Sequence, residues 1–213
     1  MKKNNIGHLR KSYDKYQLND NLNFNSPFSL FKLWFDEATK DERIEEVNAM
    51  TLSTISKDGF PRSRIVLLKE YSIDGFIFYT NYNSIKGRSI SINPKVCLKF
   101  FWPSLEKQII LKGNASKVSK KKSDKYFDSR PEGSKMGAIV SPQSEKILNR
   151  DFLEGRLLNC IDKKNKLKRP NYWGGYIVKV ISFEFWQGRP NRLHDRILFE
   201  LYKNKWNKFR LAP

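Results

Sequence analysis

The hydrophobic positions of this chain gather in short runs that are separated by turn residues. Residues 49–55 and 61–69 are two such runs, and a Lys-Asp-Gly turn at 57–59 separates them. Because consecutive strands joined by short turns pair antiparallel, the pattern predicts a meander or a barrel. The expected strands cover residues 49–55, 61–69, 76–80, 96–102, 108–118, 171–186, 196–202 and 206–211.

Helical spacing of apolar residues occurs in fewer places. Residues 29–40 bring Leu30, Leu33 and Trp34 to one face, after a Ser-Pro start signal. Further helices are expected at residues 84–92, 123–130 and 144–166. The last helix is predicted to bury Ile147, Phe152, Leu153, Leu157 and Ile161. The total indicates a mainly β, α+β protein, a small antiparallel barrel with helices around it.

The chain organisation is simple. Residues 1–26 are polar and are expected to form a flexible N-terminal segment, whereas residues 27–213 are expected to form a single domain. No apolar run has the length of a membrane span or the position of a secretion signal. Cys97 and Cys160 form neither a disulfide framework nor a metal cluster, so we expect a cytoplasmic protein with no metal, and Cys97 in the core.

The formal charge of +19 raises the question of a polyanionic partner. Lysines are scattered along the chain, and the densest runs, at 117–122 and 163–169, have the pattern of solvated faces. No basic run is interleaved with the stacking aromatics that single-stranded nucleic acid prefers. We therefore expect small anionic ligands, and neither nucleic acid nor a membrane.

The strongest chemical signal lies at residues 183–196. An aromatic strand ends at a Gly-Arg-Pro turn, and Arg192, His194 and Arg196 follow at alternate positions. If this run is extended, the three side chains share one face, which would be cationic and able to handle protons. An exposed basic edge strand is the simpler alternative for such a run.

Three other groups suit anions. Ser84 and Lys86 open a predicted helix, whose N-terminus favours phosphate. Tyr126 and Arg130 would share a helix face, whereas Ser134 must approach from a turn because of Pro131. Arg64 and Lys69 stand at the two ends of an apolar strand, where strict alternation places them on opposite faces. Charged strand ends and a surface tyrosine stacked on arginine are the ordinary alternatives.

Several of these motifs together resemble one family. Glu184-Phe-Trp-Gln-Gly188, Arg192-Leu-His-Asp-Arg196 and Arg210-Leu-Ala-Pro213 are similar to pyridoxine (pyridoxamine) 5′-phosphate oxidase, and the match extends from about Ile6 to Pro213. The resemblance implies an FMN-binding split barrel that works as a homodimer. It also implies oxidation of pyridoxine and pyridoxamine 5′-phosphates to pyridoxal 5′-phosphate, with oxygen as acceptor and hydrogen peroxide as product.

The resemblance also assigns roles to single residues. Arg192 and His194 would be catalytic, beside the pyridine ring. FMN would be bound by Arg64, Lys69, Tyr79, Thr80, Lys86, Gln108, Gln143, Ser144, Trp186 and Arg196, with Gln143 and Ser144 acting across the dimer. The substrate would be bound by Lys69, Tyr126, Arg130, Ser134, Arg192 and His194, with Arg10 and Tyr13 in a segment that folds over it.

One position departs from the family pattern. The family has Ser-Arg-Lys where this chain has Ser84, Ile85 and Lys86, so one phosphate-binding arginine is missing. Arg88 could substitute for it, or FMN could bind more weakly. The alternative functions are a split-barrel flavoprotein with another substrate and a basic flavin- or nucleic-acid-binding module without turnover.

Overall fold

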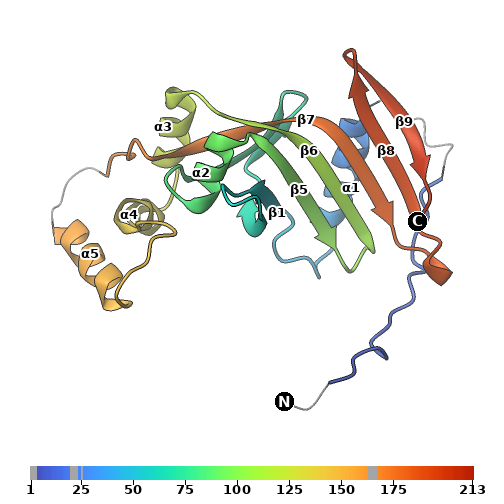
Figure 1. The fold of residues 1–213 in the computed structure, drawn as a ribbon, viewed down its shortest axis with the longest axis horizontal. Coiled ribbons are helices and arrows are strands. Elements are labelled where there is room, and N and C mark those ends of the chain that lie inside the picture. The colour runs from blue at the N-terminus through green and yellow to red at the C-terminus, as the bar shows by residue number, and fades with distance from the viewer. Residues whose placement is uncertain (1–3, 20–23, 25, 163–166) are drawn as a thin grey trace. The chain divides into compact units, whose positions relative to one another are not determined.

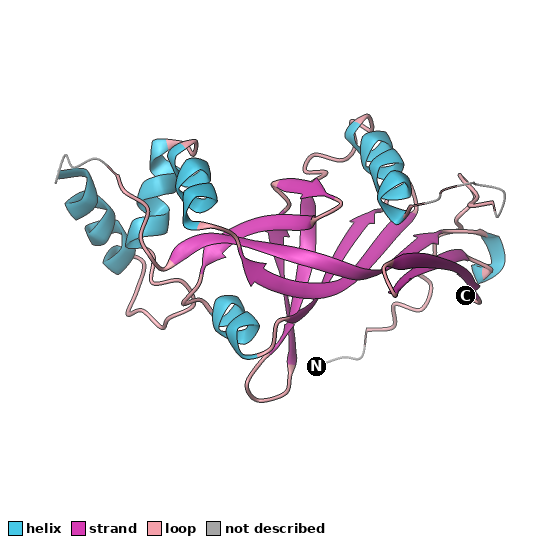
Figure 2. Ribbon diagram, turned by 90° about the horizontal axis from the view of Figure 1, so that it is seen from above, coloured by secondary structure: helices cyan, strands magenta, loops and turns pink. Residues whose placement is uncertain are grey.

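The computed structural model describes residues 4–19, 24, 26–162 and 167–213 (Figure 1). The chain divides into two compact units. Unit 1 comprises Met1–Val47, Lys99–Leu111 and Ser182–Pro213, and unit 2 comprises Asn48–Leu98 and Lys112–Ile181. Figure 2 distinguishes the strands, in magenta, from the helices, in cyan.

Strands and helices follow one another along the described chain in a mixed order. The strands are β1 (Ala49–Ile55), β2 (Pro61–Leu67), β3 (Glu70–Ser72), β4 (Gly75–Asn81), β5 (Lys95–Trp102), β6 (Lys107–Lys117), β7 (Trp173–Gln187), β8 (Asp195–Tyr202) and β9 (Lys205–Leu211). The helices are α1 (Pro27–Thr39), α2 (Ile85–Ile92), α3 (Lys120–Asp128), α4 (Glu132–Val140) and α5 (Asp151–Asp162), with a 3-10 turn η1 (Pro190–Arg192).

The strands follow the order β2-β1-β5-β6-β7-β4-β3, and β8 pairs with both β7 and β9. The β1/β2, β3/β4, β4/β7, β7/β8 and β8/β9 pairs are antiparallel. This register places Leu52 opposite Arg64, and Trp186 opposite Arg196. The predicted mainly β fold with antiparallel pairing and flanking helices is therefore confirmed.

The core of unit 1 is aromatic and forms on α1. Ser26 caps this helix by accepting a hydrogen bond from the Phe28 N–H, as the Ser-Pro start signal predicts. Phe31 and Trp34 are buried and meet Phe100 and Phe185 of the strands edge-on, at 5.4 and 5.3 Å. Burial of each large side chain contributes about 1.5–3 kcal/mol, so these contacts fix α1 against the strands. Leu33, which shares the predicted stripe, is instead 41% exposed.

Unit 2 has its own core of strand residues. Met50, Leu52, Phe76, Phe78 and Val178 are at most 1% exposed. The alternating burial of β1 reflects one covered face, whereas β4 is buried along nearly its whole length. The charged side chains that emerge from these strands are therefore held on a rigid base.

Several sequence predictions need correction at element ends. Helix α3 ends at Asp128, and a further helix, α4, begins directly after Pro131, where a turn was expected. Proline is well tolerated at a helix start, and this explains why a helix, and not a turn, follows Pro131. Strand β2 ends at Leu67, before Lys69, and the short β3 was not expected. Cys97 lies in β5 as predicted but is only half-buried, not in the core.

The helix predicted at residues 144–166 begins only at Asp151, and residues 163–166 lie outside the described chain. Ser144 has a positive φ of 74°, which is incompatible with a helix. Three of the five predicted core positions are also wrong, because Ile147, Phe152 and Ile161 are 38%, 42% and 50% exposed, whereas Leu153 and Leu157 are half-buried. Within its unit, α5 therefore shows an apolar surface to the outside.

Candidate functional site

Unit 2 contains two cations at the start of α2. Arg64 of β2 donates from Nη1 to the Leu52 carbonyl oxygen and to Thr54 Oγ1, at 3.0 and 2.9 Å. Lys86, in the first turn of α2, is only 9% exposed, and its Nζ lies 3.5 Å from Ser84 Oγ. Ser84 also caps α2 by accepting the Gly87 N–H. Lys86 thus lies at a helix start and feels the charge of Arg64, and such a grouping suits an anion.

Electrostatics agree with this interpretation. Burial, and then the neighbouring charge of Arg64, lowers the pKa of Lys86 to about 8. Burial, and then Arg62, lowers the pKa of Arg64. None of the carboxylates in the described residues forms an ion pair with either side chain. A bound phosphate would supply the missing negative charge.

Arg88, which could substitute for the missing family arginine, is engaged with a carboxylate in the structure. Arg88 Nη1 forms an ion pair with Glu145 Oε1 at 2.7 Å, and both side chains are about half exposed. Ile85 is half-buried in the first turn of α2, beside Lys86. The anion position in unit 2 therefore depends on Arg64, Lys86 and the end of the helix.

Tyr79 and Thr80 lie near the end of β4 and contact further predicted site residues. Thr80 Oγ1 donates to Gln143 Oε1 at 3.2 Å, which joins two of the predicted FMN ligands. Tyr79 stacks on Tyr126, with ring centres 3.8 Å apart. Gln143 and Ser144 lie in the loop between α4 and α5 and not at a helix start, so this part of the prediction was wrong.

Arg130 and Ser134 line a cavity in unit 2. The cavity has a volume of about 310 Å³, and Gln143 and Trp173 also line it. The guanidinium of Arg130 lies 4.6 Å from the centre of the Trp173 ring. Its Nη1 atom is buried and has no hydrogen-bond partner, and burial lowers the pKa of the group. A buried, unsatisfied donor is costly unless a ligand completes it, so Arg130 is suited to an anion.

Of the other residues predicted to bind the substrate phosphate, Ser134 shares the cavity with Arg130, whereas Lys69 does not line it. Ser134 lies in the first turn of α4, not in a turn. Lys69 is exposed, follows the end of β2 and donates its backbone N–H to the Ile77 carbonyl oxygen. Strand alternation therefore does not relate Lys69 to Arg64, and Lys69 is not a lining residue of the Arg130 cavity.

In unit 1, the predicted common face of Arg192, His194 and Arg196 is not formed. Arg192 ends the 3-10 turn η1 with a φ of 62°, and β8 begins only at Asp195. Because no continuous strand joins the three residues, period-two alternation does not apply. Arg196 lies opposite Trp186 and makes two hydrogen bonds to Glu184 Oε1, at 3.0 and 2.8 Å. Gln108 lies half-buried in β6.

His194 is fixed by its backbone surroundings. Its Nδ1 accepts the Arg189 N–H at 3.1 Å, so the ring is held as the tautomer that carries its proton on Nε2. The ring lies 4.7 Å from Trp186. Burial, and then the charge of Arg192, lowers the pKa of His194, with Asp195 opposing. The imidazole is therefore a neutral group with an N–H to donate.

A second cavity, of about 330 Å³, lies next to this imidazole in unit 1. Arg10 and Tyr13 of the N-terminal segment line it together with Arg192 and His194. Tyr13 meets Trp186 edge-on at 5.6 Å and His194 at 5.9 Å. The structure thus brings the predicted covering segment to the predicted catalytic pair.

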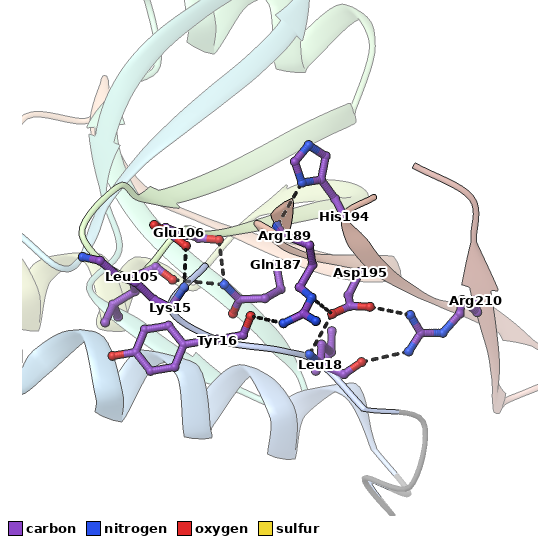
Figure 3. A network of polar contacts seen from close by, with 10 residues as sticks. All are labelled: Lys15, Tyr16, Leu18, Leu105, Glu106, Gln187, Arg189, His194, Asp195 and Arg210. Atoms are coloured by element: carbon purple, nitrogen blue, oxygen red, sulfur yellow. Dashed lines mark hydrogen bonds and ion pairs between the residues drawn. The ribbon is translucent and has the colours of Figure 1, made fainter. Parts of the chain in front are cut away.

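Sequence reasoning missed the residues that support this pocket. Buried Gln187 donates from Nε2 to the carbonyl oxygens of Leu105 and Glu106 (Figure 3). Arg189 and Asp195 hold the N-terminal segment, and neither had been assigned a role. Gln187 lies within the quoted motif Glu184–Gly188 and Asp195 within Arg192–Arg196, and this was the only sequence signal for either residue. The described residues contain no group of three or more potential metal-ligating side chains, and none of their helices could cross a membrane.

Comparison with known proteins finds matches along most of the chain. The family model described as pyridoxamine 5′-phosphate oxidase matches residues 35–161, and the one described as the C-terminal dimerisation region of pyridoxine 5′-phosphate oxidase matches residues 173–213. A pyridoxine/pyridoxamine 5′-phosphate oxidase of Flavobacterium psychrophilum is 54% identical, over 98% of this chain and 99% of its own. That of Christiangramia forsetii is 50% identical, over 98% of both chains.

Solved structures give the same fold. PhzG from Burkholderia lata, in complex with tetrahydrophenazine-1-carboxylic acid, matches with a TM-score of 0.87 and 27% identity, over 95% of this chain and 100% of its own. A pyridoxamine 5′-phosphate oxidase-related, FMN-binding protein from Nostoc punctiforme has a TM-score of 0.72 at 12% identity, over 88% and 98% of the two chains. The second likeness shows the fold alone.

Proposed function

Because this chain belongs to the pyridoxamine 5′-phosphate oxidase family, we propose that it oxidises pyridoxine and pyridoxamine 5′-phosphates to pyridoxal 5′-phosphate with bound FMN. The observation that carries the proposal is Arg130, which lines the cavity of unit 2 and whose buried Nη1 atom has no hydrogen-bond partner. A phosphate monoester accepts hydrogen bonds from the guanidinium and also balances its charge, whereas an uncharged substrate leaves the charge unbalanced. The relatives at 50% identity or more carry the name of this same oxidase.

The residues present fit FMN. Arg64 and Lys86 are cations held at a helix start, with no carboxylate partner in the described chain, and they suit the FMN phosphate. When bound, FMN supplies the redox chemistry by accepting a hydride from the substrate's exocyclic carbon and returning the electrons to oxygen as hydrogen peroxide. The remaining proposed ligands of FMN are Lys69, Tyr79, Thr80, Gln108, Gln143, Ser144, Trp186 and Arg196.

The substrate is held at two ends. Arg130, Tyr126 and Ser134 bind its phosphate, with Lys69 as a further cation. Arg192 and His194 bind the substituents of the pyridine ring. Because His194 Nδ1 is occupied by the Arg189 N–H, the imidazole donates from Nε2 and orients the ring without a net charge.

Arg10 and Tyr13 cover the substrate and exclude water from it. Tyr13 already lies against Trp186 and His194, which supports this role. Exclusion of water strengthens the polar contacts that orient the substrate.

We further propose a homodimer in which Gln143 and Ser144 reach the FMN of the partner. The match to a dimerisation region at residues 173–213 supports it, and so do the exposed side chains of Leu148 (92%) and Leu158 (61%) around α5. A monomer in solution that still binds FMN tightly would exclude this assembly. We also propose a location in the reducing cytoplasm, because a chain with only two cysteines offers no disulfide framework.

A direct assay tests the function. The purified protein should be yellow, release FMN on denaturation and convert pyridoxine 5′-phosphate to pyridoxal 5′-phosphate with uptake of oxygen. Unphosphorylated pyridoxine is the matched control and should react far more slowly. A yellow protein that turns over neither B6 phosphate would favour a flavoprotein with another substrate. A colourless protein that does not bind added FMN would contradict the flavoenzyme proposal.

A further inference from the structure

Asp195 stands at the centre of a polar network in unit 1. Its Oδ1 accepts from Arg210 Nη1 at 2.8 Å, and its Oδ2 accepts the Leu18 N–H at 3.0 Å. Arg189 Nε lies 3.5 Å from the same Oδ2 atom. In Figure 3, Arg189 and Arg210 approach Asp195 from opposite sides. Both carboxylate oxygens are thus engaged, and one of them holds the backbone of the N-terminal segment.

The two arginines hold the same segment. Arg210 Nη2 donates to the Leu18 carbonyl oxygen at 2.8 Å, and Arg189 Nη1 donates to the Tyr16 carbonyl oxygen at 3.1 Å. The β8/β9 register pairs Ile197 with Arg210, and this brings Arg210 close to Asp195. We name Arg189, Asp195 and Arg210, with their contacts to residues 16–18, the clasp.

The segment is attached again a few residues earlier. The Lys15 N–H donates to Glu106 Oε2 at 3.2 Å (Figure 3). Lys15 Nζ also donates to the Ser104 carbonyl oxygen at 2.8 Å. Between these points and the cavity, Tyr13 packs on Gly188, where a Cβ atom would lie only 2.7 Å from Tyr13 Cγ. Glycine at this position therefore permits the close approach of Tyr13.

The segment itself supplies little that would keep it in place. Residues 4–12 are exposed and form no helix or strand, and Leu18 is the only fully buried side chain among residues 4–19. Its position over the cavity therefore depends on the polar contacts at residues 15–18. Arg10 and Tyr13 line the cavity in this arrangement of the segment.

We propose that Asp195 is a positioning residue, which acts through the clasp to keep Arg10 and Tyr13 over the substrate. The proposal rests on the proposed oxidase function for its kinetic consequences. Surface ion pairs alone contribute little. This carboxylate is only 19% exposed and orients two arginines toward backbone carbonyl groups, so its loss affects every contact of the clasp.

The full-length enzyme loaded with FMN provides the kinetic test. Asp195→Asn keeps the shape of the side chain and removes its charge. We expect the KM for pyridoxine 5′-phosphate to rise about tenfold, the change that follows loss of a charge-assisted contact. FMN content should stay unchanged, and kcat should change far less than KM. Glu200→Gln, on the exposed side of the same strand, is the matched control and should behave as the wild type.

A double variant separates positioning from a direct effect on His194. If Asp195 acts through the segment, Asp195→Asn should raise KM in the wild type but add little in a Tyr13→Ala background. Equal effects in the two backgrounds would overturn the proposal. So would loss of FMN with a parallel fall in kcat, which indicates general damage to the fold.

Limited proteolysis gives a readout that does not depend on activity. Trypsin cleavage after Lys11 and Lys15 should be about tenfold faster in Asp195→Asn than in Glu200→Gln, because the segment is released more often. Unchanged cleavage rates would overturn the clasp. If the wild type does not oxidise pyridoxine 5′-phosphate, the proposed function fails, and proteolysis still decides whether Asp195 holds the segment.

Discussion

Arg130 offers the sharpest test of the phosphate site. Its Nη1 atom is buried without a partner, while the guanidinium lies over the Trp173 ring. In the absence of a phosphate ligand, the unsatisfied donor costs about 1–3 kcal/mol. The cation–π contact returns about 0.5–2 kcal/mol. In Arg130→Met both contributions disappear and the apolar stem remains, so the free energy of unfolding should change by less than about 2.5 kcal/mol.

The loss of substrate binding should be larger. A charge-assisted hydrogen bond to phosphate contributes about 1.5–3 kcal/mol, which corresponds to roughly 10- to 150-fold in affinity. We therefore expect Arg130→Met to raise the KM for pyridoxine 5′-phosphate by that factor and to keep FMN bound. Urea unfolding of the FMN-free protein and steady-state kinetics of the loaded enzyme measure the two quantities separately.

Arg88→Met is the matched control for Arg130→Met. Arg88 is a half-exposed arginine paired with Glu145, and such pairs contribute about 0–1 kcal/mol. It should change neither stability nor KM appreciably. The reasoning is refuted if Arg130→Met leaves KM within about twofold of the wild type, or destabilises the FMN-free protein by more than about 3 kcal/mol.

Three further predictions concern cofactor and proton chemistry. Lys86 has a pKa of about 8, against an ordinary value of 10.5 in the unfolded chain, so the folded protein loses this proton above pH 8. Above that pH the affinity for FMN should fall, while the stability of the FMN-free protein should rise. An FMN affinity that stays flat between pH 7 and 9 would contradict this. Ile85→Arg should tighten FMN binding, and Arg88→Ala should leave it unchanged, because Arg88 is paired with Glu145. His194 has a pKa below its ordinary 6.5, so the acid limb of kcat/KM should lie below pH 6.5, and a limb above that value would show a different titrating group.

The strands could be predicted from sequence because their signals are local. Strand β1 has the predicted limits, since an alternating apolar run ends at a turn with Gly59, whose φ is 82°. Helix α4 was missed because Pro131, Gly133 and Gly137 lower the helical signal. The apolar spacing of α5 was taken as a sign of burial within the chain, whereas these side chains are exposed in the structure. The spacing of apolar residues shows that a helix has an apolar face, but it does not show what covers that face.

The candidate site was predicted in its residue types and not in its geometry. The motif around His194 predicted a proton-handling group, but the positive φ of Arg192 interrupts the expected strand face. Such a backbone conformation leaves no clear sequence signal when the residue is not glycine. The clasp could not be predicted from the sequence either, because Asp195 and Leu18 are 177 positions apart and come together only in the folded chain.

Five cations of this chain fall into two classes that sequence alone does not separate. Arg196 and Arg210 are paired with Glu184 and Asp195, so their charges are already balanced and stabilise β8 and the N-terminal segment. Arg64, Lys86 and Arg130 are at least half-buried, and none of the described carboxylates pairs with them. Burial of a cation without a partner costs free energy, as the lowered pKa values of all three show. An anionic ligand best explains why the protein keeps these costly buried cations, and FMN and the substrate each carry one phosphate.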